Sequence, residues 1–305
     1  MAKTPHKTQD DWGLYRSFLA VMHEGSLSGA SRALGMTQPS MGRHIGALEQ
    51  ALGVTLFTRS PDGLQPTPIA QELLGTVEAM ASAARQAARV ASGGAKDERG
   101  TVRITASQIM GGEVLPQLLA QYREQHPQVT IELALNNKSE DLLKREADIA
   151  VRMVRPTQQA LIAKRLGKIE IGLYAHRRYI KAHGNPRDLL EMSQHTLIGF
   201  DQDPTITNLA KQAGLSVSRD DFAFRTDSDL AQMAALRAGM GIGGCHIGIA
   251  RRDPALVPVL ADQLTFSLDM WLLTHSDLRS NKRVMSLFRF LSDELTQYAR
   301  TSLRD

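Results

Sequence analysis

Three short helical segments follow one another between residues 14 and 52, and this close succession limits how the N-terminal part can fold. In each segment, apolar residues recur at the spacing of one helix face. Ser26 and Thr37 are good N-cap residues for the second and third segments, and Pro39 fits a first helical turn. Because only Gly35-Met36 separates these two segments, we expect a helix, a tight turn and a helix.

Polar side chains are concentrated at the start of the third segment. Its apolar stripe leaves Gln38, Ser40 and Arg43 on the outer side, with His44 or Ala47 beside them. An α-helix fits the major groove, where Gln can hydrogen-bond adenine and Arg can hydrogen-bond guanine. Arg can also bind phosphate groups of the DNA backbone. The pattern therefore favours duplex DNA as a partner. A three-helix bundle with a merely hydrated polar face is also compatible with it.

Four segments of this region form a distinctive pattern: Gly25–Leu34, Thr37–Ser40, Ile45–Gly53 and Leu56–Arg59. Together they resemble the winged helix-turn-helix of LysR-type transcriptional regulators. Two positions depart from the family pattern: Gly42 stands where a serine usually touches DNA, and Ala70 stands where glycine is usual.

The resemblance implies which residues touch DNA. Recognition-helix residues would contact base pairs, and Arg59 would belong to the grip of the wing on phosphate groups. The turn Ser60–Gly63 fits the tip of a two-stranded wing, although an ordinary surface turn is also compatible. The candidate DNA-contacting residues are Ser28, Arg32, Thr37, Gln38, Pro39, Ser40, Arg43, His44 and Arg59.

Residues 67–92 predict one long helix that joins two copies of the chain. Thr67 caps it, Pro68 starts it, and its apolar residues alternate at spacings of four and three. A lone helix of about 25 residues, roughly 37 Å long, needs a partner to bury such a stripe. The alternative is packing on its own chain. The candidate dimer contacts are Leu73, Val77, Met80, Ala84, Ala87 and Ala91.

The pattern changes to α/β after residues 93–99, which are small and charged, as is typical of a hinge. A β-α-β-α-β run from Gly100 to Val151 predicts parallel strands with a crevice at their carboxyl ends. A second α/β unit follows, and a later strand returns to the first. The expected domains are 1–66 (winged helix-turn-helix), 67–92 (linker helix), 93–99 (hinge) and 100–305. The resemblance implies that the last of these has lobes of about 100–162 plus 267–305 and about 163–266.

Two α/β lobes joined by two crossings can hold a small molecule between them. The resemblance implies the periplasmic-binding-protein-like effector domain of the LysR family. Each candidate also has a structural alternative, such as a helix cap at Ser107, a turn at Asn136 or a helix start at Asp227. The candidate effector contacts are Ser107, Gln108, Asn136, Arg152, Phe200, Asp201 and Asp227.

The expected ligand follows from the charges of these candidates. Arg152 favours an anion, whereas Asp201 and Asp227 favour an amine or a hydroxyl. Together they predict a polar organic acid or a zwitterion.

Composition excludes several other roles. The formal net charge of +4 permits a polyanionic partner without requiring one. A single cysteine, Cys245, rules out an intrachain disulfide and fits a reducing cytoplasm. No apolar run reaches the roughly 18–20 residues of a membrane helix, and the polar N-terminus predicts no secretory signal.

Catalytic and metal-binding motifs are missing from the sequence. Cys245 and His246 are neighbours on a predicted strand, so their side chains point to opposite faces and do not pair easily. The sequence contains no HExxH, CxxC, GxSxG or phosphate-binding loop. We therefore expect no enzyme, no metal and no cofactor.

These patterns together predict a cytoplasmic, ligand-responsive regulator that binds a pseudo-palindromic promoter site as a dimer, and the resemblance implies that two dimers often form a tetramer. The alternative is an α/β solute-binding module or enzyme that carries a helical interaction domain.

Overall fold

The computed structural model describes residues 11–60, 63–91, 99–137, 147–155, 161–204, 208 and 217–303. The chain divides into two compact units, of which the N-terminal one ends at Ala88 and the C-terminal one begins at Arg89. Each unit has a hydrophobic core of its own. Apart from Arg99, the predicted hinge lies outside the described residues.

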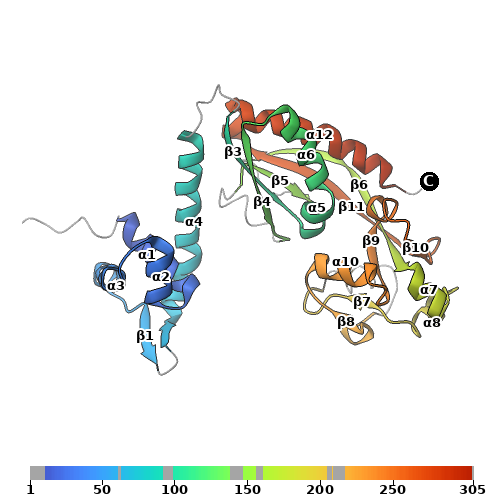
Figure 1. The fold of residues 1–305 in the computed structure, drawn as a ribbon, viewed down its shortest axis with the longest axis horizontal. Helices are drawn as coiled ribbons and strands as arrows, with labels where there is room; N and C mark the ends of the chain where they lie inside the picture. Colours follow the sequence, from blue (N-terminus) through green and yellow to red (C-terminus); the bar gives the residue numbers. More distant parts are fainter. Residues whose placement is uncertain are drawn as a thin grey trace, which may run out of the picture. The chain divides into compact units, whose positions relative to one another are not determined.

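The N-terminal unit contains a helix-turn-helix, a two-stranded wing and a long helix (Figure 1). Side chains of Asp11, Ser26 and Thr37 cap its first three helices by accepting backbone N–H groups. Gly25 and Gly35 end the first two helices in the left-handed conformation, which glycine adopts without steric cost. The elements are α1 (Trp12–Glu24), α2 (Leu27–Leu34), α3 (Gln38–Leu52), β1 (Phe57–Ser60), β2 (Gly63–Pro66) and α4 (Pro68–Ala91).

The core of this unit fixes α3 against α1 and the wing. Phe18 and Leu48 are fully buried, and the ring of Phe18 lies 5.8 Å from that of Phe57. Burying one such side chain stabilises the fold by about 1.5–3 kcal/mol. The Glu49 carboxylate also accepts the N–H groups of Leu56 at 2.7 Å and Phe57 at 3.2 Å. Packing on its inner side and the hydrogen bonds of Glu49 therefore fix the position of α3, and with it the orientation of its outer face.

The C-terminal unit is built on a mixed sheet. Its strand order is β10-β6-β11-β5-β3-β4, and β9 pairs with β6. β3 runs parallel to β4 and to β5, which confirms the predicted parallel start of this domain. The elements are β3 (Gly100–Ala106), α5 (Gln108–Glu113), α6 (Leu115–Gln125), β4 (Val129–Leu135), β5 (Ile149–Arg152), β6 (Leu161–His176), α7 (Arg177–His183), α8 (Leu189–Met192), β7 (Ile198–Gly199), η2 (Arg219–Asp221), β8 (Phe224–Arg225), α10 (Asp229–Arg237), β9 (Ile242–His246), α11 (Ile247–Ala250), β10 (Leu256–Val259), β11 (Thr265–His275), η3 (Ser276–Ser280) and α12 (Lys282–Thr301).

Two long strands connect the two lobes of this unit. β6 and β11 pair antiparallel from Leu161 opposite His275 to Gly172 opposite Thr265. Figure 1 shows both strands running from the lobe that contains β3, β4 and β5 to the lobe that contains α7, β7 and α10. The predicted pair of α/β lobes with two crossings is thus confirmed.

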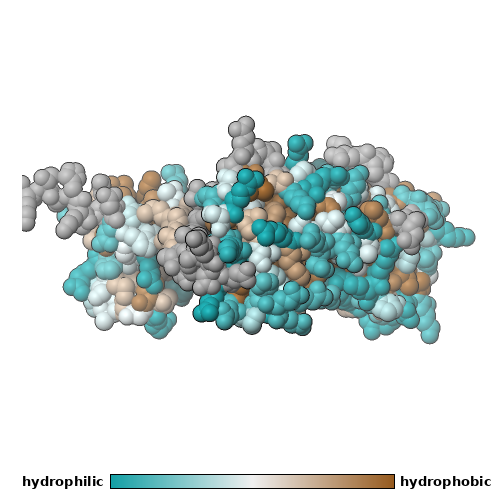
Figure 2. Space-filling model, turned by 90° about the horizontal axis from the view of Figure 1, so that it is seen from above, coloured by the Kyte–Doolittle hydropathy of each residue, from teal (hydrophilic) through white to brown (hydrophobic). Residues whose placement is uncertain are grey.

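The last helix, α12, covers the first lobe. Val284, Leu287 and Leu291 on its inner face are buried. Arg283 is also buried, and its guanidinium donates to the carbonyl of Thr101 at 3.2 Å. Figure 2, which views the molecule from the side of α12, shows a largely hydrophilic surface on this domain. Of the helices in the described ranges, none combines the length and the apolar character needed to span a membrane.

Candidate DNA-binding surface and effector cavity

The N-terminal end of α3 presents an ordered row of polar side chains. Thr37 Oγ1 donates to Ser40 Oγ at 2.9 Å, and Arg43 Nη2 donates to the same oxygen at 3.0 Å. Gln38 and Pro39 are exposed beside this row. Hydrogen bonds between the side chains order them before any partner binds, which lowers the entropic cost of binding.

α2 adds a second arginine near this end of the unit. Arg32 is exposed, and its Nη1 donates to Ser28 Oγ one helical turn earlier, at 3.0 Å. A guanidinium has five N–H donors, so this bond leaves most of them available to phosphate oxygens. α2 packs against α3, which places both arginines on one helix-turn-helix.

His44 and Arg59 are the remaining predicted DNA contacts. Nδ1 of His44 shares a 2.7 Å hydrogen bond with the hydroxyl of buried Ser17, so only Nε2 is left for DNA. Arg59 lies on β1 opposite Leu64, as expected for the wing. The side chain of Arg59 lies outside the described parts of the chain.

The structure corrects one predicted dimer contact on α4. Val77 is fully buried in the core of its own unit, and Leu73 packs partly against the same core. The first half of α4 therefore turns its apolar stripe toward its own helices, because heptad spacing does not specify which partner covers the stripe. The side chain of Ala91 lies outside the described residues. The predicted contacts that are exposed are Met80, Ala84 and Ala87.

Three predicted effector contacts lie at the carboxyl ends of β3 and β4. Ser107 does not cap α5 through its side chain, and its buried Oγ has no hydrogen-bond partner among the described residues. Gln108 accepts a hydrogen bond from Ser228 Oγ at 3.0 Å, and its N–H donates to Asn137 Oδ1 at 2.9 Å. The N–H of Asn136 donates to the last carbonyl of β3.

Two of the charged candidates, Arg152 and Asp201, form hydrogen bonds with other residues of their own domain. Arg152 is buried and donates to Thr105 Oγ1 at 2.9 Å and to the Val151 carbonyl at 3.1 Å. The carboxylate of Asp201 accepts from Arg219 Nε at 2.9 Å. Hydrogen bonds from Gln202 and from Arg219 hold the pKa of Asp201 below its ordinary value.

The third charged candidate, Asp227, anchors a loop. Its carboxylate accepts the N–H groups of Asp201, Gln202 and Asp203 at 2.9, 2.9 and 3.1 Å. These bonds, that from Asp203 foremost, hold the pKa of Asp227 below its ordinary value. The helix that follows is capped by Ser228, so a helix cap is not the role of Asp227.

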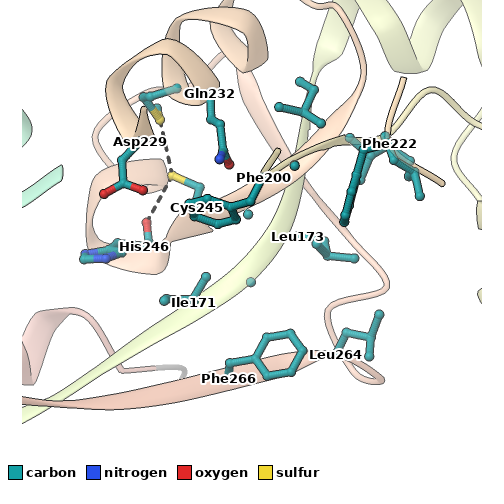
Figure 3. A pocket seen from close by; sticks show the side chains of 18 of the residues that line it. Ile171, Leu173, Phe200, Phe222, Asp229, Gln232, Cys245, His246, Leu264 and Phe266 are labelled. Carbon is teal, nitrogen blue, oxygen red and sulfur yellow. Dashed lines mark hydrogen bonds between the residues drawn. The ribbon is translucent and has the colours of Figure 1, made fainter. Parts of the chain in front are cut away.

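An apolar cavity of about 220 Å³ lies between β6, β7, β9 and α10. Of the predicted effector contacts, only Phe200 lines it. Figure 3 shows Phe200, Phe222 and Phe266 around the cavity, with Gln232 pointing toward its interior. The other described lining residues are Ile109, Ile171, Gly172, Leu173, Met192, Leu197, Ile198, Gly199, Val217, Asp229, Met233, Ile242, Gly243, Gly244, Cys245, His246 and Leu264.

Burial sets the charge of the titratable groups at this cavity. Desolvation raises the pKa of Asp229, although Asn137 donates to its Oδ2 at 3.0 Å. Burial also raises the pKa of Cys245 to about 12 and lowers that of His246 to about 4. Both are neutral at pH 7. Cys245 is buried, and its Sγ lies 3.8 Å from the sulfur of Met233.

The two lobes are fastened together beside the cavity. Glu113 of α5 accepts two hydrogen bonds from Arg237 of α10, each of 2.7 Å. Arg237 also pairs with Asp253 at 3.2 Å. Gly112 permits this approach, because a Cβ there would lie 2.5 Å from a methyl carbon of Leu230. Across the described ranges, no group of three or more His, Cys, Asp or Glu side chains could hold a metal ion.

Most of the cavity-lining residues were not predicted from the sequence. Ile171, Leu173 and Phe266 lie on strands, where their pattern is that of an ordinary core. The only sequence signal near them is the pair Gly243-Gly244, where two side chains are missing from a buried strand.

Comparison with protein families covers most of the chain. Residues 12–71 match the family described as "Bacterial regulatory helix-turn-helix protein, lysR family", and residues 95–296 match "LysR substrate binding domain". The probable HTH-type transcriptional regulator LtrA of Klebsiella pneumoniae is 24% identical over 284 residues, which are 90% of this chain and 92% of that protein. The HTH-type transcriptional regulator CrgA of Neisseria meningitidis is 25% identical over 294 residues, with 91% and 95% covered.

Solved structures agree in fold. CbnR, described as a LysR family transcriptional regulator, superposes with a TM-score of 0.66 at 18% identity, covering 97% of this chain and all of that chain. Full-length CbnR in complex with its target DNA superposes with a TM-score of 0.65 at 18% identity, covering 96% and 100%. With a DNA-binding helix-turn-helix domain and an effector-binding domain in the same order, this chain belongs to the LysR family of bacterial transcriptional regulators.

Proposed function

We propose that this regulator reads a pseudo-palindromic promoter site with the N-terminal end of α3. The observation that carries this proposal is the hydrogen-bonded row of exposed Thr37, half-buried Ser40 and exposed Arg43, with Gln38 and Pro39 exposed beside it. In helix-turn-helix proteins, the first residues of the second helix reach base edges in the major groove. The positive end of the helix dipole also favours a phosphate group there.

The exposed side chains divide into two roles. Gln38 can bond adenine through two hydrogen bonds, so it reads sequence. Arg32 and Arg43 are held in place by serine hydroxyls and face solvent, which suits contacts with phosphate oxygens. Ser28 acts by positioning Arg32, and Thr37 acts by positioning Ser40.

Two copies of the chain pair through the outer face of α4. Ile69 and Met80 are 41% and 38% exposed, and Ala84 and Ala87 are also open to solvent. An apolar helix face of this kind favours a partner helix, and small residues allow close approach. A dimer presents two α3 helices to two half-sites. Substituting Met80→Glu should shift the protein toward monomer in sedimentation experiments, and an unchanged dimer would contradict this arrangement.

Effector binding would occur in the C-terminal domain and alter the closure of its two lobes. The Glu113–Arg237 pair joins the lobes directly, so a ligand beside it can favour one degree of closure over another. The change would pass through a tetramer of two dimers and alter the spacing or bending of bound DNA. We infer that the protein acts in the cytoplasm as a regulator and catalyses no reaction.

DNA binding by purified protein tests the proposal. Fluorescence anisotropy with the duplex upstream of its own gene should show specific binding that weakens steeply as salt rises, because bound arginines release counterions. Gln38→Ala should cost about 1–3 kcal/mol on the specific duplex and little on a random one. Arg43→Ala should weaken binding to both duplexes and lower the salt slope.

Gln50→Ala is the matched control for the glutamine. Gln50 is also exposed on α3 but lies near the other end of the helix, so its loss should leave DNA affinity unchanged. Equal losses for Gln38→Ala on both duplexes would contradict a base-reading role. Absence of any DNA binding would favour the alternative of a solute-binding module with a helical interaction domain.

A further inference from the structure

The cavity of the C-terminal domain is lined by aromatic and sulfur-containing side chains from separate elements. Phe200 follows β7, Phe222 precedes β8 and Phe266 lies on β11. Figure 3 shows these rings on different sides of the space. Met192 and Met233 add thioethers to the wall. Aromatic rings and thioether sulfurs both make favourable contacts with an aromatic ring, beyond the gain from burying its surface.

The described part of the cavity wall offers no positive charge to an acid. No Lys or Arg is among its described lining residues, and its one carboxyl group, Asp229, has a pKa raised by burial. A carboxylate ligand would lose its hydration without gaining a cation and would face Asp229. Arg152, the arginine expected to bind an acid, bonds instead to Thr105 and to the Val151 carbonyl. The lining therefore favours an uncharged ligand, unlike the polar acid or zwitterion expected from sequence.

One part of the wall can hydrogen-bond a ligand. The side-chain amide of Gln232 is fixed because its Nε2 donates to the Thr226 carbonyl at 2.8 Å, and the amide points toward the cavity in Figure 3. Asp229 lies one turn earlier on α10. A hydroxyl or carbonyl group on the ligand would meet this side, while the rest of the molecule stays among apolar groups.

We propose that the effector is an uncharged compound with a single aromatic ring and one hydroxyl or carbonyl substituent. The proposal rests on the regulatory function proposed above and names the ligand class of its effector domain. The size agrees, because an apolar cavity of about 150 Å³ holds benzene and this one measures about 220 Å³. Three Phe rings supply the specificity for the ring, and Gln232 orients the polar substituent.

Three ligands of the same shape and different charge test the proposal. Calorimetric titration of the full-length protein would compare benzyl alcohol, benzoate and benzylamine at pH 7. We expect benzyl alcohol to bind at least tenfold more tightly than either charged compound. Tighter binding of benzoate would overturn the uncharged class in favour of an acid. Tighter binding of benzylamine would overturn it in favour of a cation paired with Asp229, and no binding of any of the three would also overturn it.

Two variants locate the binding in this cavity. A Cβ at Gly244 would lie 3.7 Å from Ile171, an ordinary contact, so Gly244→Leu should fill part of the space and weaken benzyl alcohol binding at least tenfold. Gln232→Leu should weaken it about fivefold, the effect of one lost hydrogen bond. Gln125→Leu makes the same chemical change at an exposed position on α6 and should have no effect. Unchanged binding in Gly244→Leu, in a protein that unfolds like the original, would refute the assignment.

DNA binding by the same preparations separates this inference from the proposed function. If the protein binds its promoter normally but does not bind benzyl alcohol more tightly than benzoate and benzylamine, only the proposed ligand class is overturned. Loss of promoter binding in the unmodified protein would count against the regulatory function, whatever the ligand results.

Discussion

A glycine in the middle of α3 gives the sharpest test of how this helix works. Gly42 lies one turn into the segment proposed to read DNA, in ordinary helical conformation, and a Cβ there would meet only a methyl carbon of Leu27 at 4.0 Å. A larger residue therefore fits without displacing anything. The family usually has a serine at this position, so Gly42→Ser and Gly42→Ala separate an effect on the helix from an effect on DNA.

The expected magnitudes follow from helix propensity and from one hydrogen bond. Gly42→Ala should stabilise the N-terminal unit by about 1 kcal/mol, and Gly42→Ser by roughly half as much. In a unit of this size, 1 kcal/mol corresponds to a rise in Tm of about 4–8 °C. If the hydroxyl of a serine at this position reaches DNA, Gly42→Ser should also bind the specific duplex about fivefold more tightly, since one neutral hydrogen bond contributes about 1 kcal/mol.

Calorimetric unfolding and fluorescence anisotropy measure the two effects separately. Gly46→Ala is the control, because Gly46 lies one turn further along α3 and a Cβ there would meet no other side chain within 4 Å. It should raise Tm as Gly42→Ala does and leave DNA affinity unchanged. An equal gain in DNA affinity from Gly42→Ala and Gly42→Ser would refute the hydroxyl contact. If neither Gly42→Ala nor Gly42→Ser raises Tm, the open helical position of Gly42 is refuted.

Three further outcomes follow from the packing of the other elements. Val77→Ala should destabilise the N-terminal unit by about 2 kcal/mol in calorimetry without weakening self-association, whereas Met80→Ala should do the reverse in sedimentation experiments. Arg237→Ala should lower the stability of the C-terminal unit by about 1 kcal/mol, a modest value because Arg237 is 41% exposed. The hydrogen bonds from Arg237 hold the pKa of Glu113 below the usual 4.5. The stability that the pair contributes should therefore be present at neutral pH and be lost as pH falls through that lowered pKa. If the difference in stability between Arg237→Ala and the original protein does not change with pH, the pairing is contradicted. Cys245, whose pKa is raised by burial, should react with iodoacetamide much more slowly in the folded protein than in denaturant, and equal rates would exclude its burial.

Sequence reasoning predicts the helix-turn-helix well because its signals are local. Ser26 and Thr37 cap the helices that they were expected to cap, and Gly25 and Gly35 end the helices before them. Each of these roles depends on atoms within about one turn of the residue itself. The parallel pairing of β3 with β4 and β5 was equally accessible, because short β-α-β connections leave few alternatives.

The effector site was much harder to predict because its polar residues depend on distant partners. Asp201 is paired with Arg219, and the carboxylate of Asp227 is taken up by three backbone N–H groups of another loop. Neither pairing leaves a trace in local sequence spacing. Ile171 and Leu173 line the cavity on a strand whose residues follow a common buried pattern, and the pattern does not distinguish a wall from a core.

The long helix α4 shows how one stripe can serve two purposes. Its heptad spacing is real, but Val77 is buried against its own helices while Met80, less than one turn later, is open to solvent. An α-helix places residues three apart on overlapping but distinct faces, so a stripe of this width can contact two surfaces. Burial of the first face fixes the angle at which the helix-turn-helix leaves α4. If the second face pairs with another copy, the same helix then sets the separation of the two α3 helices, and with it the half-site spacing that the dimer can read.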